Sequence, residues 1–271
     1  MASCKVCDEP LVLEVEDEEV GGVQTFPDDL ELPCGCRFHW QCLMDQASEV
    51  AMSLNCPACH SQLATNTAGP SVTNPFLHVS AGARILTRYH NEGGLQEDLD
   101  ILPEITEEAY LEANPEARPA RAFHVMCTEG DLDGVVELLR AVDRDQNAAG
   151  AGGSSSSAAE DNEPSLNPAQ LMRYQDPLNN SKTGLHLAVE NGQEEIVWLL
   201  LWLASPLSAE VFPPAAVNAA HAMGLQRPAT TPADDIRLLQ DNGGRTAESV
   251  AAGMDGIWNL IVEAGALRPG V

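Results

Sequence analysis

Seven cysteines and one histidine near the start of the chain have the residue types and spacing of metal ligands. Gaps of two residues let paired thiolates converge on one tetrahedral ion, because the chain between them can turn tightly around the metal. Eight such ligands suit two closed zinc sites, and these would be structural, since a catalytic zinc keeps one position open for water. The candidate ligands are Cys4, Cys7, Cys34, Cys36, His39, Cys42, Cys56 and Cys59.

Charge and composition limit the classes of partner. The 271 residues include 41 Asp or Glu and 14 Lys or Arg, giving a formal net charge of -27. Such a surface repels phosphate backbones and anionic lipid head groups, so we expect neither nucleic acid nor membranes as partners. The N-terminus shows no secretory signal, which predicts an intracellular protein of the cytoplasm, the nucleus or both. In a reducing compartment the cysteines are expected to bind metal, although a disulfide cluster stays the simplest alternative.

The segment Cys34-Gly-Cys-Arg-Phe-His-Trp-Gln-Cys42, followed by Cys56-Pro-Ala-Cys59, resembles the RING finger family. The resemblance implies an interleaved ligand pattern, with Cys4, Cys7, His39 and Cys42 on a first zinc and Cys34, Cys36, Cys56 and Cys59 on a second. A PHD-type or other treble-clef module is the main alternative fold. The single residue between Cys34 and Cys36 favours RING, although that family more often has His at the position of Cys36.

The same resemblance implies a surface that contacts a ubiquitin-conjugating enzyme or ubiquitin. Val6 and Pro57 match the aliphatic and proline positions of that surface. Gln46 stands where the family usually has an aromatic residue, and His60 stands where an Arg or Lys often stabilises ubiquitin. Both departures favour weaker ligase activity.

The segment between Cys7 and Cys34 contains ten acidic residues and no basic residue. One interpretation is a solvated, mobile loop, as charged surface loops commonly are. The other is an acidic patch, including Glu18 and Glu19, that accelerates docking of a basic conjugating-enzyme surface.

Composition divides the chain into three parts. Residues 1–64 form the predicted RING-like domain, and residues 65–117 are expected to be a linker with a short strand at 84–89. Thr106 is the predicted N-cap of a short helix within that linker. Residues 118–271 are predicted to be helical, with inserts near 146–165 and 206–233.

The helical part resembles ankyrin repeats. Thr183-Gly-Leu-His-Leu-Ala188 matches the Thr-Pro-Leu-His-x-Ala signature of that family, with Gly184 in place of proline. Weaker copies lie at 123–139 and 241–266, so about three degenerate repeats are expected. His124 and His186 occupy the histidine position of the motif, for which we predict a structural hydrogen-bonding role.

Trp198 and Trp202 stand four residues apart, so they are expected on one face of a helix. Either the insert at 206–233 folds over them, or they are exposed anchors for a substrate. The predicted fold class is therefore multidomain: a small α+β zinc-stabilised RING domain followed by an all-α ankyrin-repeat solenoid. The functional hypothesis is a ubiquitin ligase that recruits a charged conjugating enzyme and a protein substrate; the alternative is a non-catalytic, zinc-stabilised adaptor.

Overall fold

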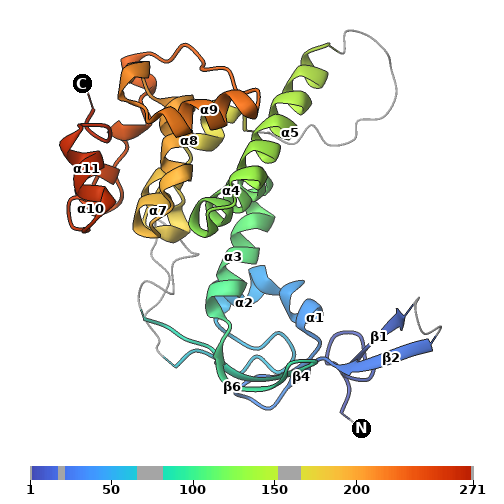
Figure 1. Ribbon diagram of the computed structural model, residues 1–271. Helices are drawn as coiled ribbons and strands as arrows, with labels where there is room; N and C mark the ends of the chain where they lie inside the picture. The colour runs from blue at the N-terminus through green and yellow to red at the C-terminus, as the bar shows by residue number, and fades with distance from the viewer. Residues whose placement is uncertain (1, 18–21, 66–81, 152–165, 270–271) are drawn as a thin grey trace. The chain divides into compact units, whose positions relative to one another are not determined.

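The computed structural model describes residues 2–17, 22–65, 82–151 and 166–269 (Figure 1). The chain divides into two compact units, Met1–Asn114 and Pro115–Val271. Each unit has its own hydrophobic core. Parts of three predicted segments, the acidic residues Glu18 and Glu19, most of the 65–80 linker and most of the 146–165 insert, lie outside the described residues.

The first unit combines short strands with three helices. Its elements in order are β1 (Val12–Asp17), β2 (Gly22–Pro27), β3 (Asp29–Glu31), β4 (Arg37–Phe38), α1 (Trp40–Met44), α2 (Ala47–Ser53), β5 (Leu86–Asn91), β6 (Gly94–Asp100) and α3 (Leu102–Ala113). Strands β1 and β2 form an antiparallel hairpin, and a second, fully antiparallel sheet has the order β4-β3-β5-β6. The acidic segment after Cys7 therefore contains ordered strands and is more than a loop.

The first unit extends well beyond residue 64. Strand β5 pairs with β3, Leu30 lying opposite Tyr89, and helix α3 packs against α2. The core that results joins Leu30 and Phe38 from the sheet to Ile101 and Ile105 at the start of α3. The segment expected to be a linker thus supplies half of the four-stranded sheet.

Helix α3 begins five residues earlier than predicted, with Ile101 as its N-cap, which corrects the assignment of Thr106. Thr106 is buried within the helix, where its hydroxyl donates to the carbonyl oxygen of Leu102 at 2.7 Å. Asp100 instead accepts from the Leu102 N–H at 3.2 Å. A threonine whose hydroxyl bonds four residues back is tolerated inside a helix, so its presence does not mark a helix start.

The second unit is built from helices and short 3-10 turns. The helices are α4 (Arg118–Glu129), α5 (Leu132–Ala151), α6 (Pro168–Met172), α7 (Gly184–Glu190), α8 (Glu194–Ala204), α9 (Pro214–Ala222), α10 (Ala247–Ala251) and α11 (Ile257–Glu263). Turns of 3-10 helix cover Pro115–Ala117, Pro177–Asn179, Ala209–Val211, Pro232–Asp234 and Ile236–Leu238. Helix α7 packs against both α4 and α10.

Gly184 at the start of α7 permits the close packing of α4 and α7. A Cβ atom at this position would lie 2.6 Å from Phe123 Cε1 and 2.8 Å from Cys127 Sγ. These distances are shorter than real Cβ contacts, so any side chain here would push the two helices apart. The departure from proline at this position is therefore explained by packing.

The predicted fold class is wrong. Over the described residues the chain is a mixed α/β protein with eleven α-helices and two small sheets, and no ankyrin solenoid is present. A solenoid stacks equivalent helices of successive repeats directly on each other. The first helices of the three pairs, α4, α7 and α10, do pack in this way. The second helices are unequal, from 20 residues in α5 to 7 in α11, and the additional helix α6 contacts both α5 and α8. The inserted segments thus take up packing positions that regular repeats would need.

Among the helices that the structure describes, none is both long and apolar enough to cross a membrane.

Candidate metal centre

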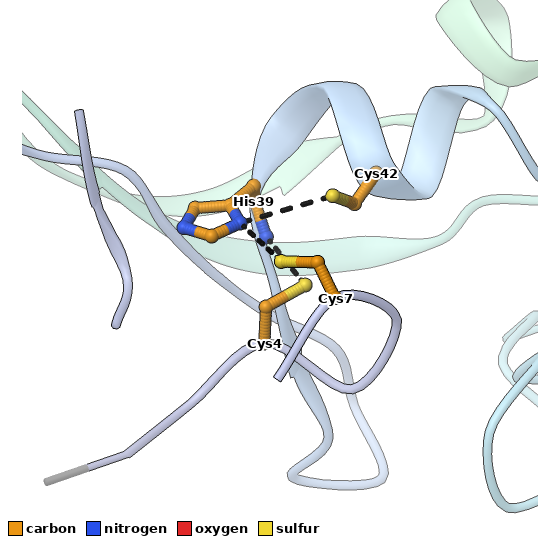
Figure 2. Close-up of side chains that lie close together, drawn as sticks. All are labelled: Cys4, Cys7, His39 and Cys42. Atoms are coloured by element: carbon orange, nitrogen blue, oxygen red, sulfur yellow. Dashed lines mark hydrogen bonds between the residues drawn. The ribbon is translucent and has the colours of Figure 1, made fainter. Parts of the chain in front are cut away.

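Four side chains of the first unit converge on one point (Figure 2). Cys4 and Cys7 come from the N-terminal turn, and His39 and Cys42 come from the start of α1. Their ligand atoms, three Sγ atoms and one ring nitrogen, all lie within 4.8 Å of one another. A tetrahedral zinc site with metal–sulfur bonds of about 2.3 Å requires sulfur atoms roughly 3.8 Å apart. The first tetrad can therefore hold a metal ion.

The hydrogen bonds of His39 select the nitrogen that faces the thiols. Nε2 lies 2.8 Å from the carbonyl oxygen of Pro10, which can only accept, so Nε2 carries the proton. Nδ1 then keeps a free lone pair, and it lies 3.3 Å from Cys7 Sγ and 3.8 Å from Cys42 Sγ. A carbonyl partner on the far ring nitrogen is the usual second-shell support of a metal-binding histidine. Figure 2 shows the ring directed at the sulfur atoms.

The second tetrad is made of Cys34 and Cys36, on the turn between β3 and β4, and Cys56 and Cys59, which follow α2. Its four sulfur atoms also lie within 4.8 Å of one another. Gly35, between the first two ligands, has φ of 84° and so supplies the left-handed conformation that this tight turn needs. The second tetrad can hold a second metal ion.

The two cysteine turns Cys4–Cys7 and Cys56–Cys59, one from each tetrad, have the same backbone form. The Asp8 N–H donates to the Cys4 carbonyl at 3.1 Å, and the His60 N–H donates to the Cys56 carbonyl at 2.9 Å. Asp8 and His60 both have positive φ, 62° and 58° respectively. Each turn thus folds its two thiols onto one side, because the residue after the second cysteine reverses the chain.

The pKa values of the thiols differ within each tetrad. Burial would raise the pKa of Cys4, but the N–H groups of Cys7, Val6 and His39 lower it to about 7. Burial and the neighbouring thiols raise the pKa of Cys42 to about 12 in the same tetrad. The three thiols of this tetrad lie in so small a volume that they cannot all ionise unaided, whereas a bound cation favours the thiolate form of each.

The same division occurs in the second tetrad. Hydrogen bonds with Ser61 lower the pKa of the exposed Cys59 to about 6. The Ser61 Oγ atom lies 3.3 Å from the Cys59 Sγ atom. Burial and the nearby Cys59 raise the pKa of Cys36 to about 12. One thiol of each tetrad therefore has a pKa below that of a free cysteine, and another has a pKa above it.

The ligand pairs alternate between the sites along the chain. The first and third pairs, Cys4 with Cys7 and His39 with Cys42, form one tetrad, and the second and fourth pairs form the other. The eight ligands are therefore grouped as the sequence predicted. Each tetrad therefore joins two segments of the chain, and a ligand pair of the other tetrad lies between those segments in the sequence. Two bound metal ions would cross-brace the unit.

An acidic residue that the sequence reasoning missed positions the ligand-bearing helix α1. Asp28 is 2% exposed and accepts from the Trp40 N–H at 3.1 Å and from the Tyr89 hydroxyl at 2.9 Å. Trp40 is the first residue of α1, so Asp28 acts as its cap from outside the local sequence. Burial, together with Asp28, raises the pKa of Tyr89 to about 12 and keeps its hydroxyl a donor.

The predicted partner-binding residues lie on separate segments. Val6, on the first cysteine turn, is 45% exposed. Pro57 is half-buried and His60 is exposed on the second cysteine turn, and Gln46 is half-buried at the start of α2. Val6 is the one exposed apolar residue of these four.

Trp198 and Trp202 are covered by the insert that follows α8. They are 8% and 7% exposed, and their rings lie 5.8 Å and 5.2 Å from the ring of Phe212. Arg227, from the same insert, lies over Trp202 and Phe212 at 5.5 Å and 5.1 Å. The structure thus favours the insert contact over free aromatic anchors.

The two motif histidines differ. His186 has Nδ1 2.9 Å from the Thr183 hydroxyl and Nε2 2.9 Å from the Arg245 carbonyl, so it links α7 to the segment before α10. His124 is buried, but neither ring nitrogen has a hydrogen-bond partner in the described chain, and Nδ1 is 4.0 Å from Asp176. The predicted hydrogen-bonding role therefore holds for His186 and not for His124.

Comparisons of the chain with protein-family models, with curated proteins and with solved structures found no match. The class of protein is therefore defined by its own geometry: a unit with two cross-braced Cys/His tetrads, followed by a helical unit with a separate core.

Proposed function

We propose that the two tetrads bind zinc and that the chain is a RING-type ubiquitin ligase acting as a scaffold. The donor sets, Cys3His and Cys4, are those of structural zinc sites, and soft thiolates favour zinc over calcium or magnesium. The observation that carries the ligase proposal is the interleaving of the ligand pairs. Interleaving separates the cross-braced RING arrangement from zinc modules in which each ion binds one continuous segment.

Zinc in these sites would supply rigid cross-links, since each tetrad already provides four protein ligands and leaves no position for a reacting water. Catalysis would come from positioning: the unit would hold a conjugating enzyme so that its ubiquitin thioester faces an acceptor amine. Val6 and Pro57 are the proposed contacts to the enzyme, and His60 is the proposed contact to ubiquitin.

The helical unit is the proposed site of substrate binding. Its core is separate from that of the metal unit, so it can present a surface of its own to a protein. The acidic charge of the chain favours a basic partner.

A non-catalytic adaptor is the second candidate. Gln46 replaces an aromatic contact and His60 replaces a permanent cation, and both changes would weaken ubiquitin transfer more than partner binding. In this case zinc would only stabilise an interaction module.

The experiment is discharge of ubiquitin from a panel of charged conjugating enzymes onto free lysine, with and without this protein. Free lysine is the right acceptor because the chain has only Lys5 and Lys182. Lys182 is also engaged, since its Nζ lies 2.6 Å from Glu190. Accelerated discharge would support the ligase proposal. If protein that holds two zinc ions accelerates discharge from none of the enzymes, the ligase proposal fails and the adaptor is the function that remains.

The control is the double substitution Cys36→Ser with Cys56→Ser, which removes two ligands of the second tetrad. It should lose one zinc ion and the acceleration together. Cys127→Ala is the matched control for removing a thiol, because Cys127 is buried in the other unit and belongs to neither tetrad.

A further inference from the structure

The second unit contains an apolar cavity that the proposed ligase mechanism does not use. It has a volume of about 230 Å³ and lies between the start of α5, helix α8 and helix α9. Helices α8 and α9 are side by side in this unit (Figure 1). Trp198, Trp202 and Phe212 form its aromatic wall, and Ala216 and Ala220 of α9 form the facing wall. Drug-sized ligands usually need about 300 Å³ or more, so the cavity suits a single side chain.

Two carboxylates also line this cavity. Glu194 is half-buried and its Oε1 accepts from the Trp198 indole N–H at 3.1 Å, which holds the carboxylate beside the ring. Glu195 is exposed, and the described part of the chain gives it no ion-pair partner. Two cations in contact with residues of the cavity wall serve other groups. Arg140 donates to the carbonyl of Met223, and Arg227, which lies over Trp202, donates to the carbonyls of Ser205 and Leu207.

A lysine or arginine side chain combines the properties that this cavity complements. Its apolar stem can lie along alanine and aromatic walls while its charged head reaches a carboxylate. A cation is attracted to the face of a tryptophan ring, and Arg227 already makes such a contact with Trp202 in this aromatic cluster. The formal net charge of -27 attracts a basic partner over longer distances.

We propose that this cavity binds a lysine or arginine side chain of a partner protein, with Glu194 and Glu195 holding the charged head. Only the partner's role as a substrate rests on the proposed ligase function; the binding itself does not. The site would give the helical unit specificity for basic, exposed segments.

The test is a titration of the full-length, metal-loaded protein, followed by the NMR signals of its four tryptophan indole N–H groups. The probes are Nα-acetyl-lysine methylamide and Nα-acetyl-arginine methylamide, and the matched neutral probe is the same lysine derivative acetylated at Nε. Trp198→Phe and Trp202→Phe assign the two signals from the cavity. These two signals should shift saturably with at least one cationic probe, while those of Trp40 and Trp258 stay in place.

Glu195→Gln should weaken binding about twofold to fivefold, the range for a single exposed ion pair. Glu263→Gln, which removes an exposed carboxylate from α11, should leave binding unchanged. Equal binding of the neutral probe, equal effects of both Glu substitutions, or no shift of either cavity signal would overturn the proposal. A preference for lysine or for arginine identifies the side chain. Because the titration contains neither ubiquitin nor a conjugating enzyme, its failure is separate from failure of the ligase proposal.

Discussion

At the scale of single residues, each cysteine turn places a non-glycine residue in the left-handed region of backbone space. Asp8 has φ of 62° and His60 has φ of 58°. Residues with a Cβ atom are about 1–2 kcal/mol less stable in this conformation, and glycine avoids that cost. Both positions directly follow a proposed ligand, so the metal is expected to hold them in this conformation.

The exchange His60→Arg tests the proposed ubiquitin contact. Arginine adopts the left-handed conformation of this position less readily than histidine, but it adds a permanent cation with five donors. We expect discharge of charged conjugating enzyme to rise by roughly twofold to tenfold, and zinc content to stay at two ions. His60→Gly, which relieves the backbone and removes the side chain, is the control. An active parent protein whose rate is the same with Arg, His and Gly would show that this position does not contact ubiquitin.

Gly184→Ala tests the close contact between α4 and α7. The new methyl group would overlap Phe123 and Cys127, so the free energy of unfolding should fall by about 1–3 kcal/mol. Urea denaturation followed by tryptophan fluorescence measures the change, since three of the four tryptophans lie in this unit. Gly253→Ala is the matched control, because the nearest atom to its new methyl group would be the Val250 carbonyl oxygen at an ordinary 3.5 Å. Equal effects at both positions would contradict the packing argument.

At the scale of elements, α1 depends on a buried carboxylate from the β2–β3 connection. Asp28→Ala would leave the Trp40 N–H and the Tyr89 hydroxyl without their acceptor, so stability should fall by about 1–3 kcal/mol. Since α1 carries Cys42, zinc should also pass faster to a chromogenic chelator. Tyr89→Phe, which leaves the bond from Asp28 to α1 intact, should release zinc at the parental rate. Equal release by all three proteins would show that Asp28 does not position the ligands.

The ligands could be predicted from the sequence because their spacing is local, and the turns that hold them are only a few residues long. The sheet around them could not be, because β5 pairs with β3 across a segment whose composition is typical of a linker. Asp28 and Tyr89 are 61 residues apart, so nothing in the local pattern of either residue indicates their hydrogen bond. The motif at 183–188 is also local, and α7 forms there as a helix. The packing of the unit could not be predicted from it, because helices α6 and α9 lie between the copies of the motif.

The burial of His186 in α7 makes the helical unit sensitive to mild acid. Burial lowers the pKa of His186, so the folded state binds fewer protons than the unfolded state, where histidine titrates near about 6.5. Stability from neutral His186 is therefore complete above that pH and decreases as the pH falls below it. Burial would raise the pKa of Asp176, but His124 and Arg121 lower it, so a second loss is expected below about pH 4.

Urea denaturation at a series of pH values from 7.5 to 5 measures the first loss. In His186→Gln the unit should be less stable throughout, but the dependence on pH in this range should be shallower. A parallel decrease in both proteins would mean that another group is responsible.

At the scale of the whole molecule, the two units have separate cores and depend on different interactions. The core of the first unit includes the candidate ligands Cys4 and Cys56, whereas that of the second contains no residue of either tetrad. A small domain of this kind takes much of its folding free energy from its metal ions. Removing the metal should therefore unfold one unit and spare the other.

Hydrogen exchange with and without a strong zinc chelator tests this expectation. Amides in residues 2–65 and 82–114 should lose protection when the metal is removed, because nothing would then hold the four ligands of each tetrad together and the turns would open. Amides in residues 115–151 and 166–269 should keep theirs, since the interlocked helices α4, α7 and α10 make no use of the metal. Cys36→Ser with Cys56→Ser, which should lose one of the two zinc ions, should cause part of the same loss of protection in the first unit without any chelator present. If the helical unit also lost protection, its stability would depend on the metal unit. Binding by its aromatic cavity would then have to be measured only on zinc-loaded protein.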